Sequence, residues 1–353
     1  MADKSELRDV QTLQMHQDAS IVVVGAGIAG LCCAQTLAAH GFRVTVVDKA
    51  RSPGGRMSTR RTEHGFGFDH GCQYFSPKGE PFKRVVETWC NAGVVKQWHG
   101  RVVIVCSSRM TDCVDATRYV GVPGMNSICN NLASRLDIRT GVRVEAVVRR
   151  DNGSQILDSS GSSSTEDLAG ETFDAVVVAI PATQAVALLD ETSQLAEFAR
   201  SVRFSPCWTV MMAFEPKLEF EADAAHIEGS ALSWICRNSS KPQRKQDGDC
   251  WVVQADADWS TNHIDRSREW IENELLDSLS AILQQPEIVP VHKQAHLWRY
   301  AIPSQSLHDG FAFDPVRQIG ICGDWCAGSR VESAFLSGIG LADRIIDLTV
   351  NAD

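Results

Sequence analysis

Three glycines and one aspartate lie at a spacing that suits the binding of a dinucleotide. The apolar run 21–24 predicts a buried parallel strand, and Gly25, Gly27 and Gly30 follow it at the start of a predicted helix. Gly25 permits the tight turn, Gly27 lets the backbone approach a pyrophosphate, and Gly30 allows the helix to lie close to the sheet. Asp48 ends the next predicted strand, about twenty positions on, where a carboxylate can accept hydrogen bonds from a ribose. The pattern therefore predicts a βαβ unit that holds a dinucleotide.

A second group of residues suited to anion binding follows one loop later. Gly54 and Gly55 form a glycine pair directly before Arg56. Paired glycines free the local backbone to approach a ligand, and a guanidinium presents a planar fork of donors that matches a phosphate. We therefore expect Arg56 to make a second contact with the phosphates of the dinucleotide.

Motifs spread over the chain resemble the FAD-binding face of the amine oxidase superfamily. The N-terminal motifs are GAGIAGL (25–31), VVDKARSPGGRMSTRR (46–61) and FDHGCQYF (68–75). Near the other end, ICGDWCAGSRVESAFLSG (321–338) is similar to the second flavin motif of that superfamily. The narrower combination GGRMSTRR, DHGCQYF, LWRYA (297–301) and GDWCAGSRVE resembles the renalase and renalase-like branch. The resemblance extends from about residue 19 to about residue 348.

The resemblance implies FAD, held without a covalent bond, as the cofactor. It also implies that Asp324 binds the ribityl chain, that the start of the final helix faces the flavin pyrimidine, and that the backbone of Val144 contacts adenine. A carboxylate in the first turn of a helix favours the helix dipole, so we expect Glu332 to act there rather than as a catalytic base. The residues predicted to bind the cofactor are Gly25, Ala26, Gly27, Ile28, Ala29, Gly30, Asp48, Lys49, Gly55, Arg56, Met57, Gln73, Tyr74, Val144, Gly323, Asp324, Val331, Glu332 and Ser333.

The order of the predicted elements indicates an α/β fold in which two domains interleave. The resemblance implies a Rossmann-like FAD-binding domain that alternates along the chain with a mixed-sheet substrate domain, as in amine oxidase and p-hydroxybenzoate hydroxylase-like proteins. The predicted boundaries are 20–76, 121–185 and 297–350 for the FAD-binding domain, 77–120 and 186–296 for the substrate domain, and 1–19 for a flexible N-terminal tail. Within them we predict a strand over 65–75 that brings Gln73 and Tyr74 to the cofactor, helices over 81–92 and 267–284, and a hairpin tip or loop over 151–164.

Candidate substrate contacts lie just before the second flavin motif and in one basic loop. Trp298 and Tyr300 can hold a flat ring against the flavin; the alternative is that both are alternating core residues of a strand. Arg237 and Lys241 belong to a loop that concentrates cations in an acidic protein. They can meet the phosphates of a bulky anionic substrate, but a run of charges is also typical of solvated surface.

The motifs point to redox chemistry carried by a flavin. The sequence contains no Ser, His and Asp arrangement within a motif, no HExxH zinc motif and no P-loop. In a flavoenzyme the cofactor carries the redox step, while the protein supplies binding, orientation and electrostatics. The renalase-like resemblance implies hydride transfer from 2- or 6-dihydro-NAD(P) to flavin N5, with NAD(P)+ as product and reoxidation by O2 to H2O2. Two alternatives stay open: an amine oxidase acting on a small amine, whose usual lysine and aromatic cage cannot be located in the sequence, and a flavin-binding protein without turnover.

Composition limits the partners that we expect. The 353-residue chain has a net charge of −10, which disfavours nucleic acid and anionic membranes as partners because both attract clustered Lys and Arg. No apolar run approaches the roughly 18–20 residues that span a bilayer.

The twelve cysteines show no CxxC pair, and the N-terminal segment does not resemble a secretory signal, so we expect free thiols in a cytoplasmic protein. Cys322 and Cys326 have no further ligands nearby, so we expect no metal site. A thioether from Cys326 to the flavin is the alternative to non-covalent binding.

Overall fold

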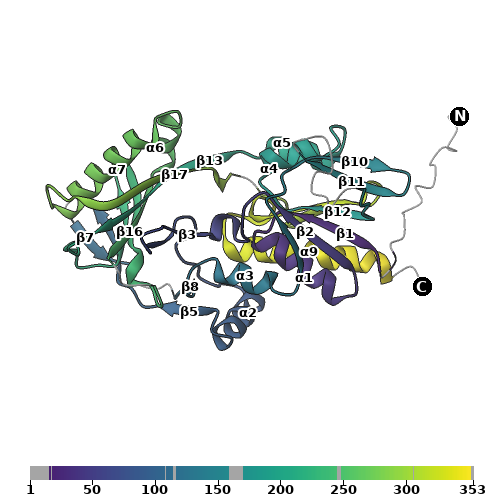
Figure 1. The fold of residues 1–353 in the computed structure, drawn as a ribbon, viewed down its shortest axis with the longest axis horizontal. Helices are drawn as coiled ribbons and strands as arrows, with labels where there is room; N and C mark the ends of the chain where they lie inside the picture. The colour runs from purple at the N-terminus through teal and green to yellow at the C-terminus, as the bar shows by residue number, and fades with distance from the viewer. Residues whose placement is uncertain are drawn as a thin grey trace, which may run out of the picture.

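The described part of the chain forms two lobes, each built on one large β-sheet (Figure 1). The structure, a computed structural model, describes residues 16, 18–107, 109–113, 117–158, 170–244, 248–304 and 306–350. Most of the predicted N-terminal tail and part of the predicted loop at 151–164 lie outside these residues. No described helix combines the length and the apolarity that crossing a bilayer would require.

The first lobe contains a six-stranded sheet with the order β18-β19-β12-β1-β2-β9. Its strands are β1 (Ser20–Val24), β2 (Arg43–Asp48), β9 (Asp137–Thr140), β12 (Ala175–Val178), β18 (Phe311–Asp314) and β19 (Ile319–Cys322). β1 pairs in parallel with both β2 and β12, so that Ile21 lies opposite Val44 on one side and Ala175 on the other. This parallel centre confirms the predicted Rossmann-like unit.

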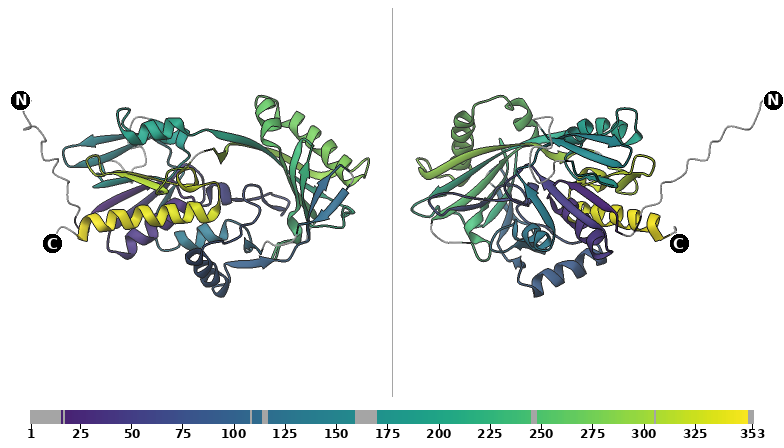
Figure 2. Two further views of the ribbon diagram at one scale, coloured as in Figure 1. Left: turned by 180° about the vertical axis from the view of Figure 1, so that it is seen from behind. Right: turned by 45° about the vertical axis from the view of Figure 1, so that its right-hand side comes forward.

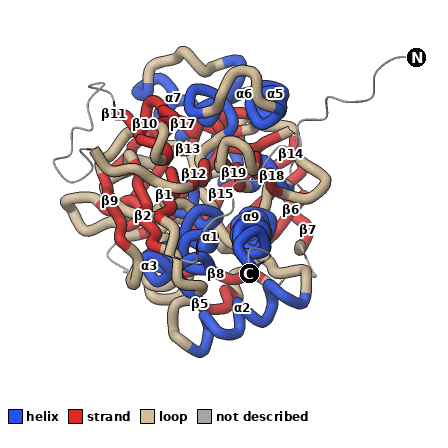
Figure 3. The backbone as a smooth tube through the Cα atoms, turned by 90° about the vertical axis from the view of Figure 1, so that its right-hand side faces the viewer, coloured by secondary structure: helices blue, strands red, loops and turns tan. Residues whose placement is uncertain are grey.

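Both faces of this sheet are covered, and the side chains of β1 alternate between them. The helices involved are α1 (Ile28–Ala39), α5 (Gln194–Ser201) and α9 (Val331–Val350). Ile21 and Val23 belong to the hydrophobic cluster of α1 and α9, whereas Val22 and Val24 belong to the cluster of α5. Figure 3 shows α1 and α9 on one side of the sheet and α5 on the other. Burial on both faces explains why β1 is a continuous apolar run.

A two-stranded hairpin beside this sheet corrects the loop predicted at 151–164. Its strands are β10 (Val144–Arg150) and β11 (Gly153–Asp158), and they pair in antiparallel fashion with Arg150 opposite Gly153. The turn at residues 151–152 confirms the predicted hairpin tip, but the prediction was wrong for residues 153–158, which form a strand. The segment is rich in Ser, Gly and Asp, but Ile156 packs into the cluster of α5, and this tertiary contact overrides the composition.

The second lobe contains a seven-stranded mixed sheet with the order β17-β13-β16-β15-β14-β6-β7, which we call the substrate sheet. Its strands are β6 (Val102–Cys106), β7 (Arg109–Asp112), β13 (Phe204–Phe214), β14 (Ala224–Glu228), β15 (Leu232–Arg237), β16 (Asp249–Ala255) and β17 (Pro290–Pro303). β17 is an edge strand that pairs with β13. The inner face of the sheet is directed toward the first lobe (Figures 1 and 2).

Two helices cover the outer face of the substrate sheet, α6 (Ala257–Asn262) and α7 (Arg268–Leu283), as Figure 2 shows. The structure confirms the helix predicted over 267–284. Ser267 is its N-cap, and the side-chain oxygen of Ser267 accepts the N–H of Trp270. Ile271, Leu275 and their helical repeats at 279 and 283 are buried against the sheet.

Short elements connect the two lobes. They are β3 (Thr59–Arg61), β4 (Gly67–Asp69), α2 (Glu80–Asn91), β5 (Val95–Trp98), β8 (Arg118–Gly121), α3 (Ser127–Ala133) and α4 (Ala182–Ala185). The helix predicted over 81–92 is confirmed as α2. The strand predicted over 65–75 is only three residues long, followed by irregular backbone up to an isolated bridge between Phe75 and Tyr119. This prediction was too long because Phe68 anchors β4 on the inner face of the substrate sheet, after which the chain turns away.

Packing shows where segments near the predicted domain boundaries belong. α5 lies within the range 186–296 that was assigned to the substrate domain, yet its side chains pack in the cluster of β1 and β12. β17 runs across the predicted boundary at 296/297 as one strand of the substrate sheet. Phe82 of α2 packs against Phe335 of α9, with ring centroids 5.2 Å apart. At α5, β17 and α2 the packing therefore differs from the predicted division of the chain.

Candidate cofactor and substrate site

The three glycines after β1 have different structural reasons to be glycine. Gly25 has a φ of +115°, and a Cβ there would lie 2.6 Å from the carbonyl oxygen of Ala179. A Cβ on Gly30 would clash with the carbonyl oxygen of Gly25, whereas a Cβ on Gly27 would meet no atom within 4 Å. Gly25 and Gly30 are therefore needed for the fold, and Gly27 leaves open space at the N-terminus of α1. Such space fits the approach of a pyrophosphate to the helix N-terminus.

Asp48 holds the glycine loop in place. One oxygen of its carboxylate accepts the N–H of Ala26 at 2.7 Å, and the other accepts the N–H of Ala50, also at 2.7 Å. The sequence predicts a contact with a ribose at this position, and that contact stays a prediction. The structure adds a positioning role, because these two hydrogen bonds connect the end of β2 with the loop that precedes α1.

Replacing Asp48 by alanine is expected to destabilise this loop and to weaken the binding of FAD. Two backbone N–H groups would lose a charged acceptor, which typically costs about 1.5–3 kcal/mol. We expect Asp48→Ala to lower the unfolding free energy of the FAD-free protein by about that amount, and Asp48→Asn, which keeps one carbonyl acceptor, to lower it less. Urea unfolding of the stripped proteins measures this. If Asp48→Ala weakened FAD but left the stripped protein as stable as wild type, the positioning role would be wrong.

The second glycine pair lies against the first glycine loop. The N–H of Gly54 donates to the carbonyl of Ala26 at 2.9 Å, and a Cβ on Gly55 would lie 3.5 Å from the Cα of Gly27. The GG-R motif thus borders the open space at Gly27, as the spacing of the motifs leads one to expect.

Arg56 joins the two flavin motifs rather than standing as an unpaired donor. Both of its terminal nitrogens bond the carboxylate of Asp324, and Nη1 also donates to the carbonyl of Ala301 at 3.0 Å. The pair uses one edge of the guanidinium fork, and a guanidinium has five N–H donors, so the predicted contact of Arg56 with the phosphates stays a prediction. The pair connects positions 268 residues apart in the chain. Arg56 therefore positions Asp324, the residue predicted to bind the ribityl chain.

The start of α9 is fixed by its own acidic residue. The carboxylate of Glu332 accepts the N–H of Lys78 at 2.8 Å and that of Gly79 at 2.7 Å, directly before α2. Glu332 therefore links α9 to α2, a structural role that the sequence did not reveal. Val331 and Ser333 lie in the same first turn, and the N–H of Gly323 donates to the buried Ser337 hydroxyl of α9 at 2.8 Å.

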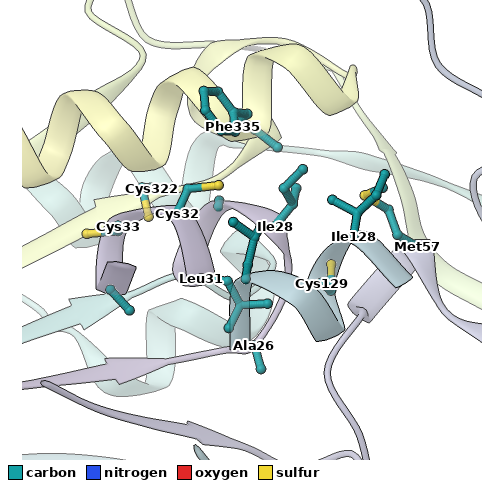
Figure 4. Packing of buried hydrophobic residues seen from close by; sticks show 14 of the residues in the cluster. Ala26, Ile28, Leu31, Cys32, Cys33, Met57, Ile128, Cys129, Cys322 and Phe335 are labelled. Carbon is teal, nitrogen blue, oxygen red and sulfur yellow. The ribbon is translucent and has the colours of Figure 1, made fainter. Parts of the chain in front are cut away.

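The remaining predicted cofactor residues lie around this group. Ile28 and Ala29 are buried in the first turn of α1, and Met57 packs in the same cluster as Ile128 of α3 (Figure 4). Lys49 donates to the side chain of Gln184 at 3.2 Å, and Val144 begins β10. The open space at Gly27, the adjoining GG-R loop and the Arg56–Asp324 pair form one continuous set, which fits an extended dinucleotide such as FAD.

Lys241 is buried in a charge network and does not face solvent, so the prediction that it meets substrate phosphates is corrected. Its side chain is fully buried, and Nζ lies 3.3 Å from a carboxylate oxygen of Asp69 and 3.2 Å from the side-chain oxygen of Gln73. Arg244 bonds the same Asp69 oxygen at 2.6 Å. Gln73, predicted to bind the cofactor, is thus held by Lys241 and by the backbone of the 69–71 turn.

Arg237 is corrected for a different reason. Strand alternation in β15 places it opposite Trp251, on the face that α7 covers. There it forms an ion pair with Asp249 at 3.0 Å, and its guanidinium lies over the Trp251 ring at 4.9 Å from the centroid. Neither predicted cation belongs to a solvated surface: Arg237 is buried on the outer face, and Lys241 is buried beside Asp69.

Trp298 lies on the inner face of the edge strand β17 next to two histidines. Its indole N–H donates to the carbonyl of His70 at 2.9 Å, and its ring centroid lies 5.0 Å from that of His70 and 4.5 Å from that of His296. Burial, and then the charges of His296 and Arg60, lowers the pKa of His70 to about 3. Burial, and then Arg60 and Arg268, lowers the pKa of His296 to about 4. Both imidazoles are therefore neutral near pH 7.

Tyr300 lies two residues further along β17. Its ring packs edge-on against Phe204, with centroids 5.7 Å apart, and its carbonyl lies 3.4 Å from Nη1 of Arg56. β17 therefore runs directly past the Arg56–Asp324 pair, and the side chains of Trp298 and Tyr300 are partly buried there.

A second aromatic group on the inner side was missed by the sequence analysis. The ring centroid of Tyr74 lies 6.2 Å from that of Trp98 and 5.6 Å from that of Trp234. The guanidinium of Arg118 lies 5.5 Å from the centroid of the Tyr74 ring. His226 packs on Trp234 at 4.6 Å. These side chains come from separate segments of the chain, so no local pattern could have revealed the group. In the described part of the chain, Trp98 Nε1 and Trp234 Nε1 are buried donors without a hydrogen-bond partner.

Comparisons with known proteins agree with this arrangement. A hydroxyneurosporene desaturase of Rubrivivax gelatinosus is 68% identical over 47 residues, but the match covers only 13% of this chain and 8% of that protein. The structure is similar to a cyclohexylamine oxidase of Brevibacterium oxydans IH-35A, with a TM-score of 0.71, 12% identity, and coverage of 94% of this chain and 99% of that one. It is also similar to a putrescine oxidase bound to putrescine, with a TM-score of 0.70, 14% identity, and coverage of 95% and 100%. At these identities the two structures support the fold alone.

Two family models match the chain in succession. The NAD(P)-binding Rossmann-like domain matches residues 23–89, which contain the glycine loop, Asp48 and the GG-R motif. The flavin containing amine oxidoreductase family matches residues 93–346, which is more than half of the chain and includes the second flavin motif. Together with the geometry of the site, the second match gives FAD as the cofactor. The chain belongs to the flavin-containing amine oxidoreductase family, a family of FAD-dependent oxidoreductases.

Proposed function

We propose that the protein is a renalase-like FAD-dependent oxidase that converts 2- or 6-dihydro-NAD(P) to NAD(P)+, with O2 as the electron acceptor and H2O2 as its product. The observation that supports this most directly is the positive charge next to Trp298. Arg60 donates from Nη1 to the side chain of Gln294 at 3.2 Å, on the same strand face as His296 and Trp298. This proposal favours an anionic substrate over a cationic one.

The two candidate substrate classes differ in charge, because an amine is cationic at neutral pH whereas a dinucleotide is anionic. Arg60 and Arg268 lie close enough to His296 to oppose its protonation, and the same field would oppose the ammonium group of an amine. Two buried carboxylates are already engaged with cations: Asp324 with Arg56, and Asp69 with Lys241 and Arg244. A dinucleotide, whose phosphates are anionic, suits these surroundings better.

The side chains around Trp298 suit hydride removal from a flat ring. When bound, FAD would supply the two-electron acceptor, with oxygen as the final oxidant. The indole of Trp298, fixed by its hydrogen bond to the His70 carbonyl, offers an aromatic face for stacking a dihydronicotinamide. A dihydronicotinamide loses a hydride and no proton, so its oxidation needs no general base. This agrees with two imidazoles whose lowered pKa makes them weak bases at neutral pH.

Anaerobic stopped-flow bleaching of the flavin tests the proposal. The panel contains the 2-, 4- and 6-dihydro isomers of NAD(P), together with putrescine and cyclohexylamine as amines. We expect the 2- or 6-dihydro isomers to reduce the flavin about a hundredfold faster than either amine, because Arg60 and Arg268 repel an ammonium group and like charges brought together cost several kcal/mol. Faster reduction by the amines would instead make the protein an amine oxidase. Reduction by no compound in the panel would leave the flavin-binding protein without turnover as the better hypothesis.

A further inference from the structure

A cavity of about 460 Å³ lies at the edge of the substrate sheet, next to the proposed ring-stacking site. β17 contributes His296, Leu297 and Arg299 to its lining, the segment before α7 contributes Arg266, and α7 itself contributes its first residue, Arg268. His296 belongs to both places, because it lines the cavity and its ring lies 4.5 Å from that of Trp298. A ligand that stacks on Trp298 can therefore extend around the edge strand into this cavity.

The lining carries an excess of positive charge. It includes three arginines, at 266, 268 and 299, and one carboxylate, Asp265. Within the described residues none of the three guanidiniums lies within ion-pair distance of a carboxylate, in contrast to the buried and paired Arg237 and Arg244. Arg266 lies over the ring of Trp270 at 5.1 Å from the centroid, which holds its side chain beside the cavity. Arg60 adds a fourth positive charge from β3, close enough to Arg268 for the two to repel.

The chemistry of the lining defines the ligand. Planar guanidinium forks bind phosphate oxygens in a bidentate manner, and clustered arginines without carboxylate partners are typical of phosphate recognition. The volume lies within the range of small-molecule sites. We propose that this cavity binds the diphosphate of the dinucleotide substrate, while its nicotinamide lies on Trp298. The proposal rests on the proposed function, and it moves the phosphate contact from Arg237 and Lys241 to Arg266, Arg268 and Arg299.

Binding of ADP-ribose to the FAD-loaded protein tests this site without turnover. ADP-ribose carries the diphosphate but no nicotinamide, and bound FAD already fills the other dinucleotide site. We expect calorimetry to show that the double variant Arg268→Ala/Arg299→Ala binds ADP-ribose at least about tenfold more weakly than wild type does. Its affinity for ADP-ribose should also depend less on the salt concentration. Arg268→Lys, which keeps the charge but loses the fork, should weaken it less. Arg84→Ala, which removes an exposed charge on α2, is the matched control and should change nothing.

A second measurement separates this proposal from the proposed function. Flavin reduction is compared between dihydronicotinamide dinucleotide and dihydronicotinamide riboside, which has no phosphate. The preference is the rate of flavin reduction with the dinucleotide divided by the rate with the riboside. We expect this ratio to be at least about tenfold lower in the double variant than in wild type. If dihydronicotinamides reduce the flavin but the variant keeps both this preference and its affinity for ADP-ribose, the cavity is not the diphosphate site. If ADP-ribose binding depends on the arginines but no dihydronicotinamide reduces the flavin, the diphosphate site stands and the proposed function is overturned.

Discussion

Replacing Asp69 by alanine is expected to destabilise the folded protein by about 3–5 kcal/mol, the usual cost of removing one partner from a buried ion pair. The side chains of Asp69 and Lys241 are fully buried, and that of Arg244 is 4% exposed. Without Asp69, two cations would remain in the interior between the lobes with no carboxylate. The hydroxyl of Thr59 and the N–H of Met125 would also lose their acceptor.

Urea unfolding of Asp69→Ala measures this effect. Asp112→Ala is the matched control, because Asp112 also pairs with an arginine, Arg101, but both side chains are largely exposed. Exposed pairs contribute little to stability, so the control should unfold close to wild type. Equal unfolding free energies for the two variants would mean that the Asp69 network does not hold the lobes together.

The same network predicts how stability depends on pH. Burial alone would raise the pKa of Asp69, but Lys241, Arg244 and the N–H of Met125 outweigh it and lower this pKa below its usual range. Because the folded pKa lies below the unfolded value of about 3.9, this stabilisation is present above that pH and is lost as the pH falls below it. In Asp69→Ala, unfolding should therefore depend less on pH in the acid range than in wild type.

Replacing Gly27 by alanine is expected to remove FAD without harming the fold. A Cβ at this position meets no protein atom within 4 Å, and its φ of −79° is one that alanine adopts freely. The methyl group would instead occupy the space that we assign to the pyrophosphate. Overpacking of this kind costs about 1–3 kcal/mol, which corresponds to about 5- to 150-fold in affinity. The variant should therefore purify with little or no yellow colour.

The ratio of the absorbance of the flavin band to that of the protein measures the FAD content. Thermal unfolding of the FAD-free protein measures the stability of the fold. Gly30→Ala is the contrasting variant, because its Cβ would clash with the Gly25 carbonyl and should destabilise the stripped protein as well. A Gly27→Ala protein that retained full FAD would contradict the placement of the pyrophosphate. A Gly27→Ala protein that unfolded like Gly30→Ala would contradict the open space.

Local patterns in the sequence were sufficient to predict the nucleotide-binding unit. The glycine spacing after β1, the carboxylate at the end of β2 and the helical repeat from Ser267 to Leu283 are determined by contacts between residues close in the chain. Such contacts depend on turn geometry and on the periodicity of apolar residues, both of which can be read from the residue order. The resemblance of the two flavin motifs then linked this unit to FAD.

Only the tertiary structure decided which charged groups are available to a ligand. Nothing near Lys241 in the sequence indicates that Asp69, 172 positions away, neutralises it, and Arg237 is turned to the outer face by the register of β15. Likewise, Arg56 meets Asp324 only because β19, which ends two residues before Asp324, pairs with β12 in the sheet of the first lobe. The sequence shows how many cationic residues a segment contains. Burial and pairing with residues on distant strands decide whether those charges can interact with a substrate.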